Sequence, residues 1–229
     1  MEADGPASHG PASGDPCAEA VEAAAFVLSL RALGMRDKAV LGAMERVPRD
    51  LFAPRRYRDL ARSDVALPLP CGQTMTAPSV VATMLTALGL RPGQGVIEVG
   101  TGSGYVTALL HRMGAAGLVT VERYATLAEE AVARFRVAGL DGVRAEVGDG
   151  LAIDAGEFDR VLVNGTLTEL PSALAARLAP SGRLVAALLS GGLPRLLVLE
   201  RDPETGLLRQ QLKGSLRLPR LAHGRALAL

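Results

Sequence analysis

The pattern of apolar and polar positions changes near residue 91. Beyond that point short apolar segments alternate with stretches in which apolar residues recur at helical spacing, and this rhythm predicts alternating strands and helices. Wholly apolar strands are typical of a sheet covered on both faces, and the alternation implies parallel strands joined by right-handed crossovers. We predict strands at residues 95–99, 118–122, 143–147, 159–163 and 183–188, and helices at 103–113, 125–138 and 171–179. This part of the chain is therefore expected to form an α/β fold with a mostly parallel central sheet and helices on both faces.

The chain before residue 91 shows helical spacing and no strand pattern. Residues 1–16 are rich in Gly, Pro, Ala and Ser, which predicts a disordered tail. Helices are predicted at residues 17–33, 37–47 and 78–89, with a short one near 57–62. At the other end, residues 193–217 have the pattern of two strands around a turn at 202–206. We divide the chain into a tail (1–16), an N-terminal helical extension with a substrate-side loop (17–90) and a cofactor-binding core (91–229).

Composition and charge argue against a nucleic-acid-binding, membrane-spanning, secreted or metal-binding protein. The 229 residues include 25 basic and 24 acidic side chains, a net charge of +1, whereas nucleic-acid-binding proteins usually carry a basic excess. No apolar stretch reaches the roughly 18 residues of a membrane span, and the acidic N-terminus lacks the features of a signal peptide. The two cysteines, Cys17 and Cys71, have no metal-ligand spacing. We expect a cytoplasmic protein without metal, nucleic-acid or membrane partners, and a monomer, with a dimer as the alternative.

The strongest local signal is a glycine-rich turn after the first predicted strand. Gly100, Gly102 and Gly104 follow that strand and open a predicted helix. In open parallel sheets, ligands bind beyond the carboxyl ends of the strands, and glycines let the backbone approach a ligand closely. Tyr105 stands where the dinucleotide fingerprint would need a glycine, and no Gly-Lys-Ser/Thr follows. A pyrophosphate-binding turn is therefore disfavoured and a P-loop is excluded.

Three acids are in register with this turn. Glu98 stands two residues before the first glycine, and that spacing resembles the motif of class I methyltransferases. Glu122 ends the second predicted strand, about where an acid grips ribose hydroxyls. Asp149 follows the third strand and resembles the residue that contacts the adenine amino group in that superfamily, although both acids could be ordinary loop residues. The set predicts a Rossmann-like class I methyltransferase fold that binds S-adenosyl-L-methionine. The expected cofactor-binding residues are Gln73, Thr74, Glu98, Gly100, Thr101, Gly102, Ser103, Gly104, Glu122, Arg123, Asp149 and Gly150.

Two segments before the sheet resemble one family within that class. Ala43-Met-Glu-Arg-Val-Pro-Arg-Asp-Leu-Phe-Ala-Pro54 resembles the AM-x-x-VPR-[ED]-x-F-x-P signature of protein-L-isoaspartate O-methyltransferases, and Leu67-Pro-Leu-Pro-Cys-Gly-Gln-Thr-Met-Thr-Ala-Pro78 resembles their LP-x-x-x-GQTIS-x-P loop. Shorter matches occur at residues 100–105, 121–123, 148–150 and 158–160. The resemblance spans roughly residues 25–190. It implies methyl transfer from S-adenosylmethionine to the carboxylate of L-isoaspartyl residues in damaged proteins or peptides, which is a repair reaction.

The resemblance also implies a role for Thr76. The family has the Ser of GQTIS at this position, at the active site between the cofactor and the isoaspartyl carboxylate, so Thr76 is the expected catalytic residue. The alternative is that Thr76 only N-caps the helix that opens at Pro78. Met75 and Asn164 are candidate substrate residues, and Asn164 either faces the methyl-transfer site or turns the chain with Gly165.

Two departures from the family pattern concern the acceptor. Val163-Asn-Gly-Thr-Leu167 replaces the small residues that usually follow the fourth strand, and Leu216-Arg-Leu-Pro-Arg-Leu221 replaces a C-terminal Phe-Val-Pro-Leu. If the second segment shapes the acceptor pocket, substrate preference has drifted. Two alternatives therefore stay open: a divergent methyltransferase for another carboxylate or a small molecule, and a cofactor-binding protein without catalysis. A nicotinamide oxidoreductase is a more distant alternative.

The expected chemistry needs few catalytic groups. A carboxylate acceptor with a pKa of about 4 is already an ionised nucleophile at neutral pH, so no general base is required. Alignment of the acceptor oxygen, the methyl carbon and the leaving sulfur can supply ~7–11 kcal/mol of the barrier. The sequence shows no Ser/His/Asp or Cys/His constellation, and this mechanism does not need one.

Overall fold

The computed structural model describes residues 16–152 and 156–226. The predicted disordered tail lies outside these residues except for Pro16, which begins the first helix.

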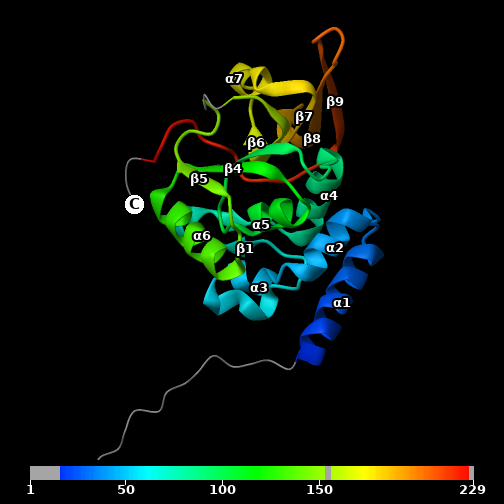
Figure 1. Cartoon of the computed structure of the whole chain (residues 1–229), viewed down its shortest axis with the longest axis vertical. Helices are drawn as coiled ribbons and strands as arrows, with labels where there is room; N and C mark the ends of the chain where they lie inside the picture. Colours follow the sequence, from blue (N-terminus) through cyan, green and yellow to red (C-terminus); the bar gives the residue numbers. More distant parts are fainter. Residues whose placement is uncertain (1–15, 153–155, 227–229) are drawn as a thin grey trace, which may run out of the picture.

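The core is one seven-stranded sheet in the order β5-β4-β3-β6-β7-β8-β9 (Figure 1). The strands are β3 (Gly95–Val99), β4 (Ala116–Glu122), β5 (Arg144–Val147), β6 (Phe158–Leu167), β7 (Leu178–Ser190), β8 (Leu193–Arg201) and β9 (Leu208–Ser215). The five strands from β5 across to β7 in this order are parallel. β8 and β9 add an antiparallel hairpin at one edge. The prediction of a mostly parallel sheet is confirmed.

Alternating side chains of the buried strands separate two cores. Val96 belongs to a core shared with the helices of one face, whereas Ile97 and Val99 belong to a second core on the opposite face. The helices of the first face are α4 (Pro78–Leu88), α5 (Tyr105–Arg112) and α6 (Ala125–Ala138). The second face carries α7 (Ser172–Ala176). Both faces are covered, as a parallel sheet requires.

Three predicted elements have wrong bounds, and one of them is β7, which is predicted at 183–188 and spans Leu178–Ser190. The helix predicted at 171–179 ends at Ala176, and residue 178 already pairs with Phe158 in the sheet. Pro180 disfavours helical geometry at residue 179, and the chain from Leu178 onward already belongs to β7. β6 continues to Leu167, four residues beyond its predicted end. Asn164 and Gly165 therefore extend the strand and do not turn the chain.

The N-terminal extension packs on the helices that cover the first face of the sheet. It consists of α1 (Pro16–Ala32), α2 (Lys38–Arg46), α3 (Arg49–Phe52) and the 3-10 helix η1 (Arg55–Leu60). The Asp37 carboxylate caps α2 by accepting hydrogen bonds from the backbone N–H groups of Ala39 and Val40. The substrate-side loop then forms a small hairpin of β1 (Leu67–Pro68) and β2 (Thr74–Met75) around the single-turn helix η2 (Pro70–Gly72).

Candidate active site

One pocket lies at the carboxyl ends of the central parallel strands. It gathers segments from the N-terminal extension, from the loops after β3, β4 and β5, from β6 and from the C-terminal end of the chain. The lining residues are 73–76, 81, 99–103, 105–106, 121–124, 148–151, 164 and 219–222. Thirteen of the fifteen predicted site residues are on this wall, and the two others, Glu98 and Gly104, lie behind it.

The glycine turn, residues 100–104, forms the floor of the pocket. Gly100, Gly102 and Gly104 have φ angles of 92°, 54° and 85°, a region that side-chain-bearing residues rarely adopt. Gly104 faces α6, because a Cβ there would lie 2.6 Å from a ring carbon of Phe135. The turn therefore requires glycine both for its backbone path and for its packing on α6.

Glu122 is fixed against this turn. Its carboxylate, in a residue only 5% exposed, accepts hydrogen bonds from the backbone N–H of Gly102 at 2.9 Å and of Tyr124 at 3.1 Å. Each carboxylate oxygen has two lone pairs, so both oxygens keep accepting capacity toward the pocket. The acid is thus held in one orientation and can still bind hydroxyl groups of a ligand.

Glu98 lies beneath the glycine turn and is fully buried. Thr107 of α5 and Thr120 of β4 donate to one carboxylate oxygen at 2.5 and 2.9 Å, and Asn164 of β6 donates to the other at 2.7 Å. Burial raises the pKa of Glu98 to about 7, although the three hydrogen bonds oppose the rise. Glu98 therefore joins β3, β4, β6 and α5 under the floor and does not reach the ligand space.

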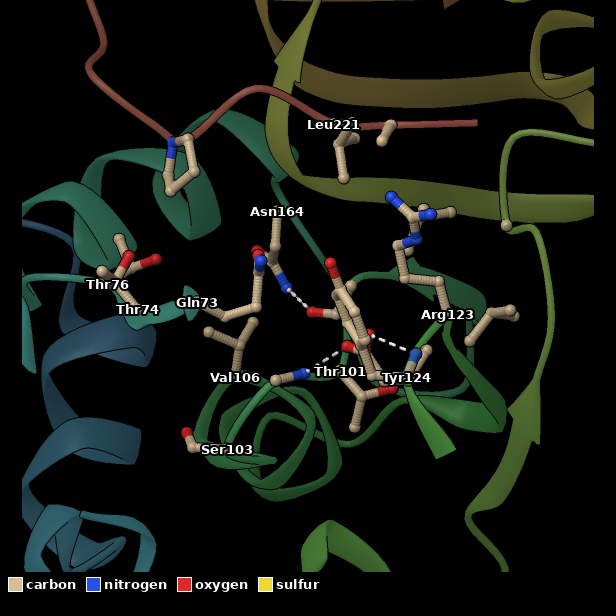
Figure 2. A pocket seen from close by; sticks show the side chains of 18 of the residues that line it. Gln73, Thr74, Thr76, Thr101, Ser103, Val106, Arg123, Tyr124, Asn164 and Leu221 are labelled. Carbon is tan, nitrogen blue, oxygen red and sulfur yellow. Dashed lines mark hydrogen bonds between the residues drawn. The ribbon is translucent and has the colours of Figure 1, made fainter. Parts of the chain in front are cut away.

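Asn164 reaches the pocket from β6 (Figure 2). Its side-chain nitrogen donates to Glu98 and, at 2.9 Å, to the carbonyl oxygen of Gly100. Both amide hydrogens are thereby used, which leaves the amide oxygen as the polar atom available on this wall. Of the two expectations for Asn164, the structure favours the position facing the site.

Asp149 connects the loop after β5 to the end of the chain. One of its oxygens accepts from the backbone N–H of Leu151 at 3.0 Å, and the other accepts from that of Gly224 at 2.7 Å. Gly150 packs so closely on Val99 that a Cβ would lie 2.6 Å from its side chain. Asp149 is therefore a structured part of the pocket rim.

The C-terminal strap, residues 216–226, closes one side of the pocket. Thr166 of β6 donates its backbone N–H to Pro219 at 2.7 Å and its hydroxyl to Leu218 at 2.7 Å, and it accepts from Leu221 at 3.0 Å. Leu221 packs on Gly165, where a Cβ would lie 2.3 Å from its Cγ. The sequence marked residues 216–221 only as a departure, and the structure shows that residues 219–222 line the pocket.

The acceptor loop, residues 73–76, carries Thr76 into the pocket. Arg49, which is 2% exposed, holds this loop by donating to the carbonyl oxygen of Thr76 at 3.0 Å. The same guanidinium donates to the carbonyl oxygens of Ala61 and Val65 at 2.7 and 3.1 Å. Burial lowers the pKa of Arg49 from its ordinary value, and the neighbouring Asp64 opposes that change. Arg49 was part of the family signature, but the sequence alone gave it no role.

Thr76 does not cap α4. The N-cap position belongs to Ala77, and the backbone N–H of Ser79 is satisfied by the Asp64 carboxylate at 2.8 Å. Within the described part of the chain, the Thr76 hydroxyl makes no hydrogen bond. It is therefore free to bind a ligand.

Two tyrosines complete the pocket and were not predicted as site residues. Tyr124 extends into the pocket beside Arg123, whose guanidinium carbon lies 5.1 Å from the ring centre (Figure 2). Tyr124 directly follows the matched Val-Glu-Arg segment at 121–123, and this position could have marked it as a pocket residue. Tyr105 is buried, and its hydroxyl has no hydrogen-bond partner among the described residues. Burial raises the pKa of Tyr105, so it is a neutral packing residue.

The described residues show neither a metal site nor a membrane span. No group of three or more His, Cys, Asp or Glu side chains in residues 16–152 and 156–226 could hold a metal ion. Over the same ranges, every helix is too short or too polar to cross a bilayer.

The fold and pocket define a Rossmann-like methyltransferase domain with an N-terminal helical extension. The two solved structures most informative for the fold are a Plasmodium falciparum chain described as a protein-L-isoaspartate O-methyltransferase, in complex with S-adenosyl-L-homocysteine, and a second protein-L-isoaspartate O-methyltransferase. The first has a TM-score of 0.74 at 20% identity, covering 86% of this chain and 97% of its own. The second has a TM-score of 0.75 at 22% identity, covering 87% and 66%. At these identities the likeness shows the fold alone.

The sequence comparisons are more specific. The family model for protein-L-isoaspartate (D-aspartate) O-methyltransferase matches residues 21–216. The chain is 49% identical to the protein-L-isoaspartate O-methyltransferase of Azorhizobium caulinodans over 79% of its length and 82% of the relative. It is 46% identical to that of Xanthobacter autotrophicus over 87% and 92%. The chain belongs to the protein-L-isoaspartate O-methyltransferase family.

Proposed function

We propose that this chain transfers the methyl group of S-adenosyl-L-methionine to the carboxylate of L-isoaspartyl residues in peptides and damaged proteins. Family membership over residues 21–216 supports this activity. The observation that carries the proposal is that Thr76 of the acceptor loop, the glycine turn and Glu122 line one pocket. A methyl donor held on the floor of this pocket would face an acceptor held by the loop.

The residues present fit the cofactor. The glycine turn has no side chains over the floor at Gly100 and Gly102, so a ligand can approach its backbone. Glu122 would hold the ribose hydroxyls through its remaining lone pairs. Asp149 would receive the adenine amino group at the rim, and Tyr124 offers an aromatic surface beside it. Thr101, Ser103, Arg123 and Gly150 complete this half of the wall.

The chain's own residues are then required mainly for positioning. When bound, S-adenosylmethionine supplies an electrophilic methyl group on a sulfonium centre. The Thr76 hydroxyl and the Asn164 amide oxygen are polar atoms of the pocket that would face the acceptor. The hydroxyl would donate a hydrogen bond to one oxygen of the acceptor carboxylate, which would leave the other oxygen as the nucleophile. Met75, which is buried in the pocket wall, excludes water there. Alignment of this kind can account for ~7–11 kcal/mol of the barrier.

The test is a paired-peptide assay. The purified chain is incubated with methyl-labelled S-adenosylmethionine and with two peptides that differ only in an L-isoaspartyl or an L-aspartyl residue. We expect label only on the isoaspartyl peptide, in base-labile ester form. Equal labelling of both peptides, or labelling of neither, would contradict the proposal.

One observation favours a second candidate, a related enzyme with a different acceptor. The C-terminal strap departs from the family pattern and lines the pocket with residues 219–222. Free aspartate and small carboxylic acids in the same assay would show such an acceptor by label that appears with them and not with the isoaspartyl peptide. Calorimetry with cofactor alone separates both enzymes from a non-catalytic binding protein, which would bind S-adenosylmethionine without turnover.

The cytoplasmic location stays a prediction.

A further inference from the structure

The active-site pocket carries its charges unevenly. On the cofactor side, the charged lining residues are Glu122, Arg123 and Asp149. On the acceptor side, the described lining residues are the acceptor loop at 73–76, Asn164 and residues 219–222 of the C-terminal strap. Arg220 is the one charged residue among these, so a negatively charged part of an acceptor would meet a single positive charge there.

The backbone of Arg220 is fixed at the wall of the pocket. Residue 220 forms a parallel bridge with Thr166 of β6, and the backbone hydrogen bonds of Thr166 with Pro219 and Leu221 hold both of its chain neighbours. Thr166 itself is only 2% exposed. Since β6 also carries Asn164, the bridge places Arg220 beside the strand that contributes to the acceptor side.

The guanidinium of Arg220 is available to a ligand. Within the described part of the chain it makes neither a hydrogen bond nor an ion pair, whereas Arg49 donates to three carbonyl oxygens of the protein. Arg220 is exposed, while Thr76 and Asn164 are half-buried. Its five N–H donors are therefore free at the outer part of the pocket.

The charge at this position is a departure from the family pattern. When the two segments are aligned on their proline, Arg220 stands where the family's Phe-Val-Pro-Leu has its leucine. A leucine side chain can only pack there, whereas a guanidinium recognises a carboxylate through two parallel hydrogen bonds. The departure therefore adds anion recognition to a side of the pocket that would otherwise carry no charge.

We propose, on the basis of the proposed function, that Arg220 binds a second carboxylate of the acceptor, from an acidic residue next to the isoaspartyl residue. The reacting carboxylate is not its partner, because a bidentate guanidinium would occupy the oxygen lone pairs that must attack the methyl carbon. Thr76 and Asn164 offer polar atoms for the reacting group deeper in the pocket. Arg220 is thus a specificity residue, and the preferred substrates are acidic isoaspartyl peptides.

The test uses two isoaspartyl peptides that differ only in the residues on both sides of the isoaspartyl residue, which are Glu in one peptide and Gln in the other. Calorimetry measures the binding of each peptide to the full chain saturated with S-adenosyl-L-homocysteine, so the measurement does not depend on methyl transfer. An exposed ion pair changes affinity by up to about fivefold, and we expect the Glu peptide to bind about three- to fivefold more tightly. This preference should shrink toward one at about 0.5 M salt, because salt screens exposed charges.

Variants of the strap assign the preference to one side chain. Arg220→Gln should abolish it, and Arg220→Glu should reverse it in favour of the Gln peptide. In turnover assays the loss in Arg220→Gln should appear as a higher KM for the Glu peptide with kcat retained, because the guanidinium does not touch the reacting atoms. The matched control is Arg217→Gln, which removes a charge from an exposed position of the same strap that does not line the pocket. This variant should keep the wild-type preference.

Several results would overturn the proposal. Equal binding of the two peptides by the wild type does so, as does a preference that survives Arg220→Gln or is lost equally in Arg217→Gln. A weaker affinity of Arg220→Gln for S-adenosyl-L-homocysteine would assign the guanidinium to the carboxylate of the cofactor and overturn it as well. Methyl label on neither peptide rejects the proposed function, while the binding preference still decides the role of Arg220. A chain that binds neither peptide overturns both.

Discussion

The two halves of the active-site pocket are built in different ways. The glycine turn and Glu122 depend on near neighbours: adjacent parallel strands bring them together, and the turn's own backbone N–H at Gly102 holds the acid. The acceptor half is assembled from the N-terminal extension and the C-terminal strap. Arg49 holds the acceptor loop at Thr76, and Thr166 of β6 holds the strap. Substitutions in the first half should change cofactor affinity. Substitutions at Arg49 or Thr76 should change turnover while cofactor affinity is kept, whereas the strap also contacts the cofactor half, since Gly224 donates to Asp149.

The largest effect is expected from Glu122→Ala. The substitution removes the acid expected to hold the ribose and also frees the backbone N–H groups of Gly102 and Tyr124. Hydrogen bonds to a charged group contribute about 1.5–3 kcal/mol each, so we expect the dissociation constant for S-adenosylmethionine to rise roughly 100-fold. Calorimetry measures this directly. Glu129→Ala, at an exposed position of α6, is the control and should bind normally; an unchanged affinity in Glu122→Ala would refute the assignment.

Arg49→Lys tests the acceptor half. A lysine keeps the positive charge, but its ammonium is a compact point charge that cannot span three carbonyl oxygens as the guanidinium does. We expect kcat for the isoaspartyl peptide to fall by roughly 30-fold, equivalent to ~2 kcal/mol, with a cofactor dissociation constant within about twofold of the wild-type value. Arg46→Lys changes an exposed arginine nearby and should leave both unchanged. An equal loss of turnover and of cofactor affinity would show that the two halves are not independent.

The sequence predicted the cofactor half of the pocket better than the acceptor half, because the first depends on near neighbours and the second on distant segments. A turn and the acids at strand ends are local patterns, so the glycine turn and Glu122 were predicted from spacing and Asp149 from a resemblance, and all of them line the pocket. Arg49 and the C-terminal strap act through contacts between distant segments, which no spacing encodes. Glu98 was placed on the wrong side of the floor because alternation along β3 turns it, like Val96, toward the helices of the first face. A motif position alone does not tell which way a strand residue points.

Thr76→Ala is expected to have a smaller effect. Among the described residues its hydroxyl has no hydrogen-bond partner, so the substitution should remove only the proposed bond to the acceptor. A neutral hydrogen bond contributes about 0.5–1.5 kcal/mol, and we expect kcat to fall up to about tenfold with cofactor affinity unchanged. Thr76→Ser keeps the hydroxyl and should retain most of the activity. If Thr76→Ala turns over normally, the hydroxyl does not touch the acceptor.

Gly165→Ala tests whether the C-terminal strap shapes the acceptor site. A Cβ at this position would overlap the Leu221 side chain, so the strap must move outward. Overpacking of this kind typically costs about 1–3 kcal/mol, part of which we expect to appear as a KM for the peptide raised by a few-fold. Gly214→Ala, where a Cβ meets nothing within 4 Å, is the matched control. If the KM is unchanged while the thermal midpoint falls, the strap only stabilises the fold.

Glu98→Gln should affect catalysis least and the pH dependence of stability most. Because the pKa of Glu98 is about 7 in the folded chain against an ordinary value of 4.5, the unfolded state loses this proton more readily than the folded state. The contribution of Glu98 to stability is therefore complete below about pH 4.5 and is lost as the pH rises through 7. One pKa unit corresponds to about 1.4 kcal/mol, so the wild type should lose about 2–3 kcal/mol between pH 5 and 8 relative to Glu98→Gln. The glutamine can still accept from Asn164 and donate to the threonine hydroxyls, so it should preserve the floor. Denaturant unfolding of both proteins across this range measures the difference, and parallel curves would show that Glu98 keeps its charge in the folded chain.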